Sequence, residues 1–312
     1  MMNTLSIGLD IRTPYQLLSF LSFLDYSKST NNILIINKDE YLSKFLSFKK
    51  LLYTYNCKVI VSSDKRDILK LVDSNNDKSI NIISVNFPEY SLKIRRPNIN
   101  LVTVNDGLSS YASFKSMYFN IKRSNRKTNI LFLLIKFIGE RILSKTLKFE
   151  EFYLHDTKRL KTNNKFAHSF KKLIDLKNSD KYPTIENKCL VFIGQPLVNL
   201  NIMSESDYIS YLEQVQKYAN DKGLEFYYKP HPLEKKEIYN CFPTIKYDGL
   251  VEELCALEKN ISIVCSFYST ALVTLPTLFD IEATRITPNI KNLYFSPKQK
   301  KLLHRAKPLL IK

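Results

Sequence analysis

Short apolar runs, separated by polar segments of helical length, recur along most of this chain and restrict the folds that it can adopt. The first half contains five such runs: Leu5–Leu9, Asn32–Asn37, Cys57–Val61, Ile80–Val85 and Asn100–Val104. Strands that alternate with helices form βαβ units, whose strands are parallel and buried on both faces. The first half therefore predicts a doubly wound parallel α/β sheet.

A second alternating series follows a basic, lower-complexity stretch from Lys115 to Tyr182, which we interpret as a connection between domains. Its expected strands and helices are Lys188–Gly194, Ser206–Lys222, Leu224–Tyr228, Leu250–Leu257, Ile261–Cys265 and Thr270–Phe279. The 312 residues suffice for two domains of about 150 residues each. We predict two Rossmann-like domains facing across a cleft, residues 1–182 with the basic helical connection and residues 183–312 with a basic tail.

One histidine, His231, lies between Pro230 and Pro232 at the end of an expected strand. Each proline fixes its own φ and biases the preceding residue toward extended geometry, so the imidazole is oriented before any ligand arrives. The other three histidines, His155, His168 and His304, stand in polar or basic, surface-like stretches. This pattern indicates a catalytic role for His231.

Ligands of doubly wound sheets bind beyond the carboxyl ends of the strands, where this chain carries several polar residues. In the second series they are Gly194, Gln195, Lys229, Pro232, Ser266, Ser269 and Thr270. Because Ser269 and Thr270 open a helix, their hydroxyls and the free N–H groups form a candidate phosphate site. The alternative, that both residues are only helix caps, is equally compatible with that segment alone, but a position opposite His231 favours phosphate.

Carboxylates at other strand ends suggest two further roles. Glu252 and Glu253, in the first turn of an expected helix, are candidates for binding ribose hydroxyls, or else surface acids that stabilise the helix dipole. Asp106, after Asn105 and before Gly107, is a candidate general base or part of an ordinary turn.

A polar segment also follows the first expected strand. Thr13 and Gln16 are candidate ligand contacts, although Pro14 between them also fits plain helix initiation.

The charge of the chain, +17 at neutral pH, favours polyanions or an anionic membrane as partners. We expect no nucleic-acid partner, because no helix-turn-helix, zinc-finger or aromatic RNA-binding motif accompanies the charge. There is also no Walker loop, no G-x-G-x-x-G, no metal-spaced Cys/His cluster and no Asp-x-Asp pair, so we expect no metal and no cofactor.

Five cysteines, mostly in apolar runs and never in a C-x-x-C pair, indicate buried thiols of a cytoplasmic protein. The first residues lack the basic region of a secretory signal. The apolar segment Ile130–Ile138 contains Lys136 and is too short to span a bilayer, but suits a membrane surface or a homodimer contact.

Taken in order, five motifs resemble those of bacterial sialyltransferases, most closely glycosyltransferase family 52, the lipooligosaccharide and capsule α-2,3-sialyltransferases. They are Thr13–Gln16, Asn105–Gly107, Phe192–Leu197, Lys229–Glu234 and Ser266–Leu272. The resemblance covers nearly the whole chain. It implies the GT-B arrangement, CMP-sialic acid as donor, inversion at the anomeric carbon and no metal.

Site roles follow from the same resemblance. It places His231 on the CMP phosphate as general acid or charge stabiliser. It places Ser269 and Thr270 on the same phosphate, and Asp106 near the acceptor. The family's usual leading acid is replaced by Asn105, which weakens the assignment of Asp106 as base. Glu205 and Asp207 are alternatives.

We therefore predict a cytoplasmic, peripheral membrane sialyltransferase that acts on a lipooligosaccharide or capsular glycan. Alternatives are a transferase of the same fold that uses another nucleotide sugar, and a non-catalytic protein that binds membranes or polyanions. The basic tail from Ser296 to Lys312, which interleaves Lys and Arg with Leu and Ile, is a candidate membrane anchor, or else a solvated basic tail whose leucines pack on the neighbouring domain.

Overall fold

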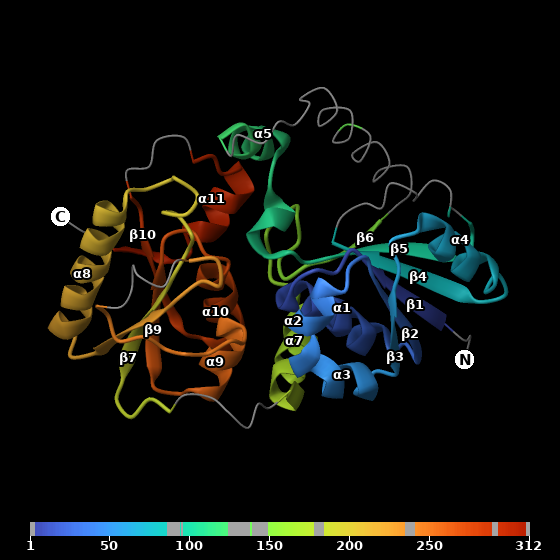
Figure 1. Ribbon diagram of the computed structural model, residues 1–312, viewed down its shortest axis with the longest axis horizontal. Helices are drawn as coiled ribbons and strands as arrows, with labels where there is room; N and C mark the ends of the chain where they lie inside the picture. Colours follow the sequence, from blue (N-terminus) through green and yellow to red (C-terminus); the bar gives the residue numbers. More distant parts are fainter. Residues whose placement is uncertain are drawn as a thin grey trace. The chain divides into compact units, whose positions relative to one another are not determined.

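The computed structural model describes residues 4–85, 94, 96–123, 138, 149–177, 184–234, 241–288 and 293–309 (Figure 1). The chain divides into two compact units. Unit 1 comprises Met1–Ser110 and Asn129–Asn178, and unit 2 comprises Tyr111–Thr128 and Ser179–Lys312.

The described part of unit 1 contains a parallel sheet of six strands in the order β3-β2-β1-β4-β5-β6. The strands are β1 (Thr4–Leu9), β2 (Asn31–Ile36), β3 (Cys57–Val61), β4 (Ser79–Ser84), β5 (Ile99–Val104) and β6 (Glu150–Phe152). In the central strand β1, Ile7 pairs with Ile33 of β2 and Ile82 of β4, and is fully buried. The strand order reverses between β1 and β4, where doubly wound sheets bind ligands.

Helices of unit 1 connect and cover these strands. They are α1 (Pro14–Ser27), α2 (Glu40–Lys44), the 3-10 helix η1 (Leu46–Phe48), α3 (Lys49–Thr54), α4 (Lys65–Asp73) and α7 (Asn164–Lys177). The 3-10 helix η2 (Gly107–Tyr111) follows β5. The helices α1 and α7 pack together, with the rings of Tyr15 and Phe170 5.5 Å apart.

In the described part of unit 2, five parallel strands have the order β11-β10-β9-β7-β8. They are β7 (Cys189–Ile193), β8 (Glu225–Lys229), β9 (Ile261–Ser266), β10 (Glu282–Ile286) and β11 (Lys307–Leu309). The helices are α5 (Phe114–Arg123), α8 (Glu205–Asp221), α9 (Val251–Leu257), α10 (Ala271–Phe279) and α11 (Pro297–Leu303). The strand order reverses between β7 and β9, so a ligand site is expected at their carboxyl ends.

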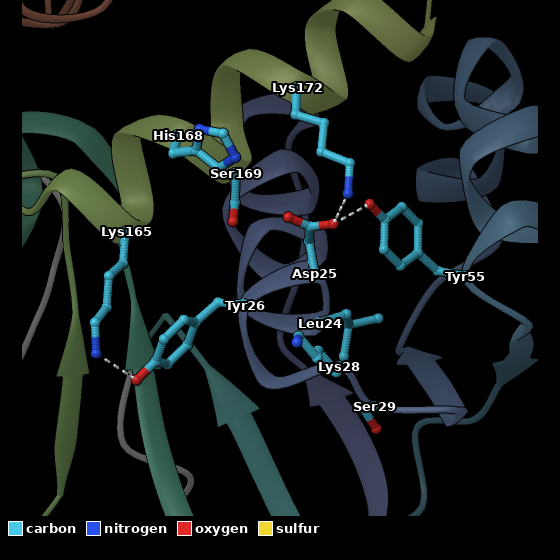
Figure 2. A pocket seen from close by; sticks show the side chains of 10 residues that line it. All are labelled: Leu24, Asp25, Tyr26, Lys28, Ser29, Tyr55, Lys165, His168, Ser169 and Lys172. Atoms are coloured by element: carbon cyan, nitrogen blue, oxygen red, sulfur yellow. Dashed lines mark hydrogen bonds and ion pairs between the residues drawn. The ribbon is translucent and has the colours of Figure 1, made fainter.

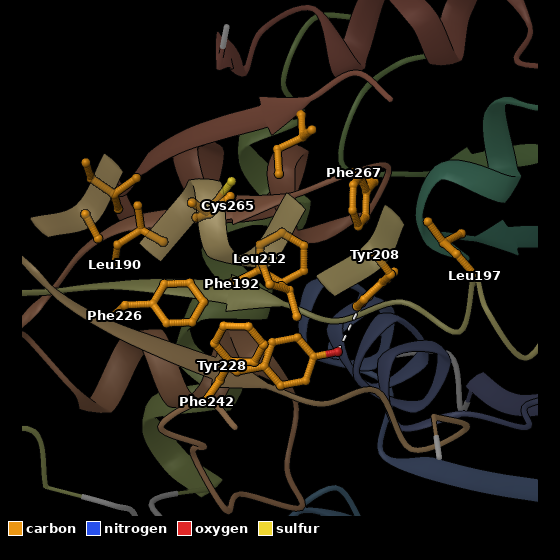
Figure 3. Close-up of a cluster of buried hydrophobic side chains, with 14 residues drawn as sticks. Leu190, Phe192, Leu197, Tyr208, Leu212, Phe226, Tyr228, Phe242, Cys265 and Phe267 are labelled. Atoms are coloured by element: carbon orange, nitrogen blue, oxygen red, sulfur yellow. Dashed lines mark hydrogen bonds between the residues drawn. The ribbon is translucent and has the colours of Figure 1, made fainter. Parts of the chain in front are cut away.

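An aromatic core supports that edge of unit 2 (Figure 3). The ring of Phe192 in β7 stacks on Tyr228 of β8 at 5.8 Å and meets Phe267, just after β9, edge-on at 5.4 Å. Tyr208 of α8 packs on the same rings, at 6.4 Å from Phe192 and 5.5 Å from Phe267. Ring pairs of this geometry add to the apolar area that they bury, so the three strand ends rest on a rigid base.

Two units, each with a parallel sheet, confirm the predicted α/β class with two Rossmann-like domains. The predicted strands agree with β1–β5 and β7–β9 to within a residue or two at each end. That the two domains face each other across a cleft stays a prediction.

The basic stretch from Lys115 to Tyr182 differs from the expected connection. It contributes β6 to the edge of the unit 1 sheet and α7 to its helical layer, while α5 is grouped with unit 2. The reason is buried apolar side chains within the basic sequence: Phe152, Phe166, Phe170 and Leu173 are all at most 2% exposed.

The described part of the tail, which ends at Leu309, is also different from a free amphipathic element, and residues 310–312 lie outside the described residues. Leu302 and Leu303 of α11 are buried in unit 2, and β11 pairs with β10. The basic residues Lys298, Lys300, Lys301 and Arg305 are exposed. The leucines therefore stabilise the unit itself.

Two predictions of burial are corrected. Cys189, Cys255 and Cys265 are buried, but Cys57 is half-buried and Cys241 is exposed. His155, expected in a surface-like stretch, is fully buried. Of the apolar segment 130–138, all but Ile138 lies outside the described residues. Among the helices that are described, none is long and apolar enough to cross a membrane.

Candidate active site

The loops after β7 and β9 form the centre of the candidate site in unit 2. The side-chain Oε1 of Gln195 accepts a hydrogen bond from the Tyr268 N–H at 2.8 Å, which joins the two loops at the point of strand reversal. The Gln195 N–H in turn donates to the hydroxyl of Tyr208 at 3.1 Å. Gln195, predicted to contact the nucleotide, thus also fixes the loop that carries Ser269 and Thr270.

His231 follows β8, the neighbour of β7 in the sheet. The Gly194 N–H donates to the Lys229 carbonyl at 2.9 Å, so the two strand ends stay paired up to the histidine turn. The His231 N–H donates to Oε2 of Glu234 at 2.6 Å, and the Glu234 N–H donates to the His231 carbonyl at 2.9 Å. These reciprocal bonds close a tight turn around Pro232, which is exposed.

Glu234 is the site residue that the sequence prediction missed. Its Oε1 accepts hydrogen bonds from the hydroxyls of Tyr208 at 2.7 Å and Tyr228 at 2.8 Å, which lie 3.0 Å from each other (Figure 3). Burial raises the pKa of Glu234, and the donors around it oppose that shift. The sequence does contain one signal for this role, the position of Glu234 three residues after His231. A carboxylate at that spacing can reach back to a backbone N–H, as in a capping box.

Gly194 is required by the close approach of this carboxylate. A Cβ at position 194 would lie 2.3 Å from Oε2 of Glu234 and 2.6 Å from the Tyr228 hydroxyl. Any side chain there would displace the group that holds the histidine turn.

The hydrogen bonds of the turn also define the protonation of His231. Its Nδ1 accepts the Leu233 N–H at 3.2 Å. Burial, and then the nearby charge of Lys229, lower the pKa of the imidazole, so it is neutral at pH 7. With Nδ1 an acceptor, the proton of the neutral ring is on Nε2, which can donate a hydrogen bond to an oxyanion.

Lys229 and Glu252 are buried charges beside the histidine turn, 8% and 3% exposed. The Lys229 ammonium donates to the Tyr247 carbonyl at 3.2 Å. Burial lowers its pKa, while nearby carboxylates, chiefly Glu252, oppose the shift. Burial raises the pKa of Glu252, whose Oε1 accepts the Thr274 hydroxyl at 2.7 Å.

Glu253 is also buried, but its bonds are local to α9. Its Oε2 accepts hydrogen bonds from the Tyr247 hydroxyl at 3.1 Å and the Leu250 N–H at 3.3 Å. Neither Glu252 nor Glu253 is therefore the exposed surface acid of the alternative interpretation. A ribose contact by either stays a prediction.

Three hydroxyl residues at the end of β9 have different environments. The Ser266 hydroxyl is buried and donates to the Ile193 carbonyl at 2.7 Å, so it joins β9 to β7. Ser269 Oγ accepts the Ala271 N–H at 3.2 Å, a capping contact. Thr270 and Ser269 are half-buried at the start of α10, where the helix dipole favours an anion.

A second group of predicted residues lies together in unit 1. Thr13 caps α1, its Oγ1 accepting the Gln16 N–H at 3.2 Å, while Gln16 Oε1 accepts the Arg12 N–H at 2.7 Å and the Thr13 N–H at 3.2 Å. Gln16 Nε2 donates to Oδ1 of Asp106 at 2.6 Å, which connects the loops after β1 and β5. The helix-initiation alternative for Thr13 is thus seen directly.

Asp106 is held on both oxygens. Its Oδ2 accepts the Ser109 hydroxyl at 2.6 Å, and its N–H donates to Ser110 Oγ at 2.7 Å. The adjacent Asn105 is buried and donates from Nδ2 to the Tyr15 hydroxyl at 2.9 Å. Among the described residues, no partner reaches its buried Oδ1.

The alternative bases Glu205 and Asp207 are exposed in the first turn of α8. In that turn it is Tyr208 that reaches the histidine turn. No group of three or more His, Cys, Asp or Glu side chains in the described part of the chain is placed to hold a metal ion.

Replacing Glu234 with Gln should weaken both the fold and the turnover. A glutamine has one acceptor oxygen in place of two, and an NH2 group in place of the other. At least one of the three donors, the His231 N–H and the hydroxyls of Tyr208 and Tyr228, therefore loses its acceptor. We expect the free energy of unfolding to fall by about 1–3 kcal/mol and turnover to fall further than stability explains. Denaturant unfolding and steady-state kinetics measure the two effects.

The control for that variant is Glu225→Gln, at the other end of β8, where the carboxylate is only half-buried. Equal losses in the two variants would show that Glu234 has no special part in holding His231.

Comparison with known proteins places these observations in context. A model of the family described as alpha-2,8-polysialyltransferase (POLYST) matches residues 11–286, which include both groups of site residues. No curated protein matches the chain.

Solved structures of several glycosyltransferases are similar at low identity. *Arabidopsis thaliana* UGT89C1 is 8% identical over 99% of this chain and 85% of its own, with a TM-score of 0.49. The spinosyn rhamnosyltransferase SpnG, complexed with thymidine diphosphate, is 9% identical over 99% and 86%, with a TM-score of 0.47. *Thermosulfurimonas dismutans* KpsC, a beta Kdo 2,7 transferase, is 13% identical over 82% and 78%, with a TM-score of 0.25. Similarities of this size carry no conclusion about activity.

Proposed function

This chain belongs to the alpha-2,8-polysialyltransferase family, and from that premise we propose that it transfers sialic acid from CMP-sialic acid to a cell-surface glycan with inversion. It is thus a glycosyltransferase of a sialyltransferase family. The proposed acceptor is a lipooligosaccharide or capsular chain, and the family description favours the 8-hydroxyl of a terminal sialic acid. The α-2,3 linkage of family 52 is the alternative that product analysis distinguishes.

The observation that carries this proposal is the neutral, pre-oriented His231 beside the strand reversal of unit 2. Its Nε2–H is available to the departing phosphate, and the half-buried Ser269 and Thr270 open α10 at the neighbouring loop. As the bond between sialic acid C2 and the phosphate oxygen breaks, negative charge grows on CMP. Hydrogen bonds to that charge stabilise the transition state more than the bound donor.

The acceptor hydroxyl oxygen forms the new bond to C2, and its proton must be removed. We assign this proton to the carboxylate of Asp106, which Gln16 and Ser109 hold in place. A positioned base of this kind contributes about 10²–10⁴-fold to the rate. The products are the sialylated glycan, CMP and a protonated base.

We propose that the reaction needs no metal ion, because a leaving monophosphate develops less charge than a diphosphate. The donors that we assign to that charge are the His231 Nε2–H, the hydroxyls of Ser269 and Thr270, and the start of α10. We also propose that the enzyme works at the cytoplasmic face of the bacterial inner membrane, where a lipid-linked acceptor would be found.

A transfer assay tests the proposed function. Incubation with CMP-sialic acid and a sialyl-oligosaccharide should release CMP and lengthen the acceptor, with α-2,8 linkages in the product and unchanged rates in EDTA. Transfer only from a UDP- or GDP-sugar would contradict the proposed donor. Loss of activity in EDTA, restored by a divalent cation, would contradict metal independence alone.

A further inference from the structure

A pocket of about 510 Å³ lies in unit 1, away from the residues discussed above (Figure 2). It lies between the end of α1, Tyr55 just after α3, and one face of α7. Ser29, which lines it, donates to the carbonyl of Thr4 at the start of β1. The pocket is therefore at the amino ends of the strands, whereas Thr13 and Asp106 are at the carboxyl ends.

The pocket has an excess of positive charge. Its carboxylate, Asp25, is ion-paired with Lys172 and accepts the Tyr55 hydroxyl at 2.8 Å. Although burial opposes it, hydrogen bonds from Lys172, Tyr55 and Ser169 hold the pKa of Asp25 below its usual value, so it is ionised and already paired.

Two further lysines line the pocket. The Lys165 ammonium donates to the Tyr26 hydroxyl at 3.0 Å, and Lys28 caps α1. In the described residues, neither has a carboxylate within ion-pair distance. Their charges remain available to an anion that enters the pocket (Figure 2).

Exposed apolar side chains lie on α7, which carries pocket residues, and on α3 and η1, which pack beside it. Tyr53, two residues before Tyr55, is 88% exposed, and Leu46 of η1 is 56% exposed. Leu176 of α7, 40% exposed, lies one helical turn beyond Lys172 on the same helix face. The Lys177 ammonium lies 4.0 Å from the ring centroid of Phe48, which keeps the end of α7 against η1.

Lysines surround these apolar side chains. Lys44, Lys49 and Lys50 are exposed along α2 and α3. The acids on the same elements are Asp39, Glu40 and Asp175, of which Glu40 pairs with Lys38 at 3.6 Å. Exposed Leu and Tyr among lysines are typical of surfaces that lie at a lipid interface.

We propose that this face of unit 1, defined by Leu46, Tyr53 and Leu176 with the pocket, binds an anionic bilayer. The apolar side chains enter the interface, and Lys28 and Lys165, at separate points of the pocket lining (Figure 2), attract the phosphates of lipid headgroups. The charge complementarity selects an anionic membrane over a protein partner with an apolar surface. This inference does not depend on the identity of the sugar donor.

The face differs from the basic tail first considered for this role. In the tail, α11 exposes its lysines, but Leu302 and Leu303 are buried and cannot contact a membrane. Unit 1 offers both components, on neighbouring elements. Two tail lysines therefore make a matched control for the loss of two charges.

Co-sedimentation with phosphatidylcholine vesicles, with and without phosphatidylglycerol, tests the proposal. The full chain should bind only the anionic vesicles, and binding should weaken as salt rises. Leu46→Ser with Tyr53→Ser should lower binding about tenfold or more. Lys28→Gln with Lys165→Gln should lower it about fivefold for each lysine.

The controls are Lys298→Gln with Lys300→Gln for charge, and Leu200→Ser for an exposed leucine of unit 2. Both should bind vesicles almost as the unchanged chain does. All variants should keep their circular dichroism spectra and their transfer activity on a soluble acceptor. That activity separates failure of this proposal from failure of the proposed function.

Three results would overturn the proposal. They are equal binding to neutral vesicles, a larger loss from the controls than from the unit 1 variants, and binding of inorganic phosphate to the pocket with no vesicle binding. The last would identify a site for a free anion.

Discussion

His231→Ala is expected to lower kcat by about 10²–10⁴-fold, because the variant loses the hydrogen bond to the departing phosphate. The fold should persist. The imidazole accepts a hydrogen bond from the Leu233 N–H, whereas the turn itself is held by Glu234 through the His231 backbone. Steady-state kinetics with CMP-sialic acid, alongside a thermal melt, measures both effects.

Two further variants make that result specific. His304→Ala removes an exposed histidine of the same unit and should leave kcat unchanged. His231→Gln restores an N–H donor and should recover part of the lost rate. A folded His231→Ala enzyme with nearly normal kcat would remove this residue from the mechanism.

Asp106→Asn is expected to abolish transfer to about the same degree, a loss of about 10²–10⁴-fold, while the affinity for CMP stays unchanged. The asparagine is nearly isosteric. Its Oδ1 can still accept from Gln16, and the Ser109 hydroxyl can turn to accept from its amide. The difference between the two side chains is then the ability to accept a proton from the acceptor.

Asp207→Asn and Glu205→Gln are the matched comparisons, since both carboxylates are exposed on α8. We expect them to keep most of the activity. An active Asp106→Asn enzyme with an inactive Asp207→Asn enzyme would move the base to α8. If all three variants stay active, none of Asp106, Asp207 and Glu205 is the base.

Sequence reasoning located the strands because parallel sheets are buried on both faces and leave continuous apolar runs. It also located the polar strand ends, because the binding edge of such sheets follows from topology alone. Gln195, His231 and Ser269 lie just after the predicted strands β7, β8 and β9, and their roles in binding or catalysis stay predictions.

What it missed depends on contacts between distant residues. Glu234 looked like the end of a motif, yet its role comes from Tyr208, 26 positions earlier, and from Tyr228. The strand β6 and the helix α7 were likewise not predicted, because they lie in a basic stretch with few apolar residues. Those residues become buried only when β6 pairs with β5 and α7 packs on α1. Local composition does not report such pairings.

Titration with CMP, UDP and GDP, followed by calorimetry, tests the central claim most directly, namely that the site around His231 in unit 2 binds the leaving nucleotide of a CMP-linked sugar. CMP should bind more tightly than UDP or GDP without added metal. Ser269→Ala with Thr270→Ala should weaken CMP binding by a few kcal/mol at most, about 1.5–3 for each hydrogen bond to a charged group. Preference for UDP or GDP, or no binding of any nucleotide, would contradict the account.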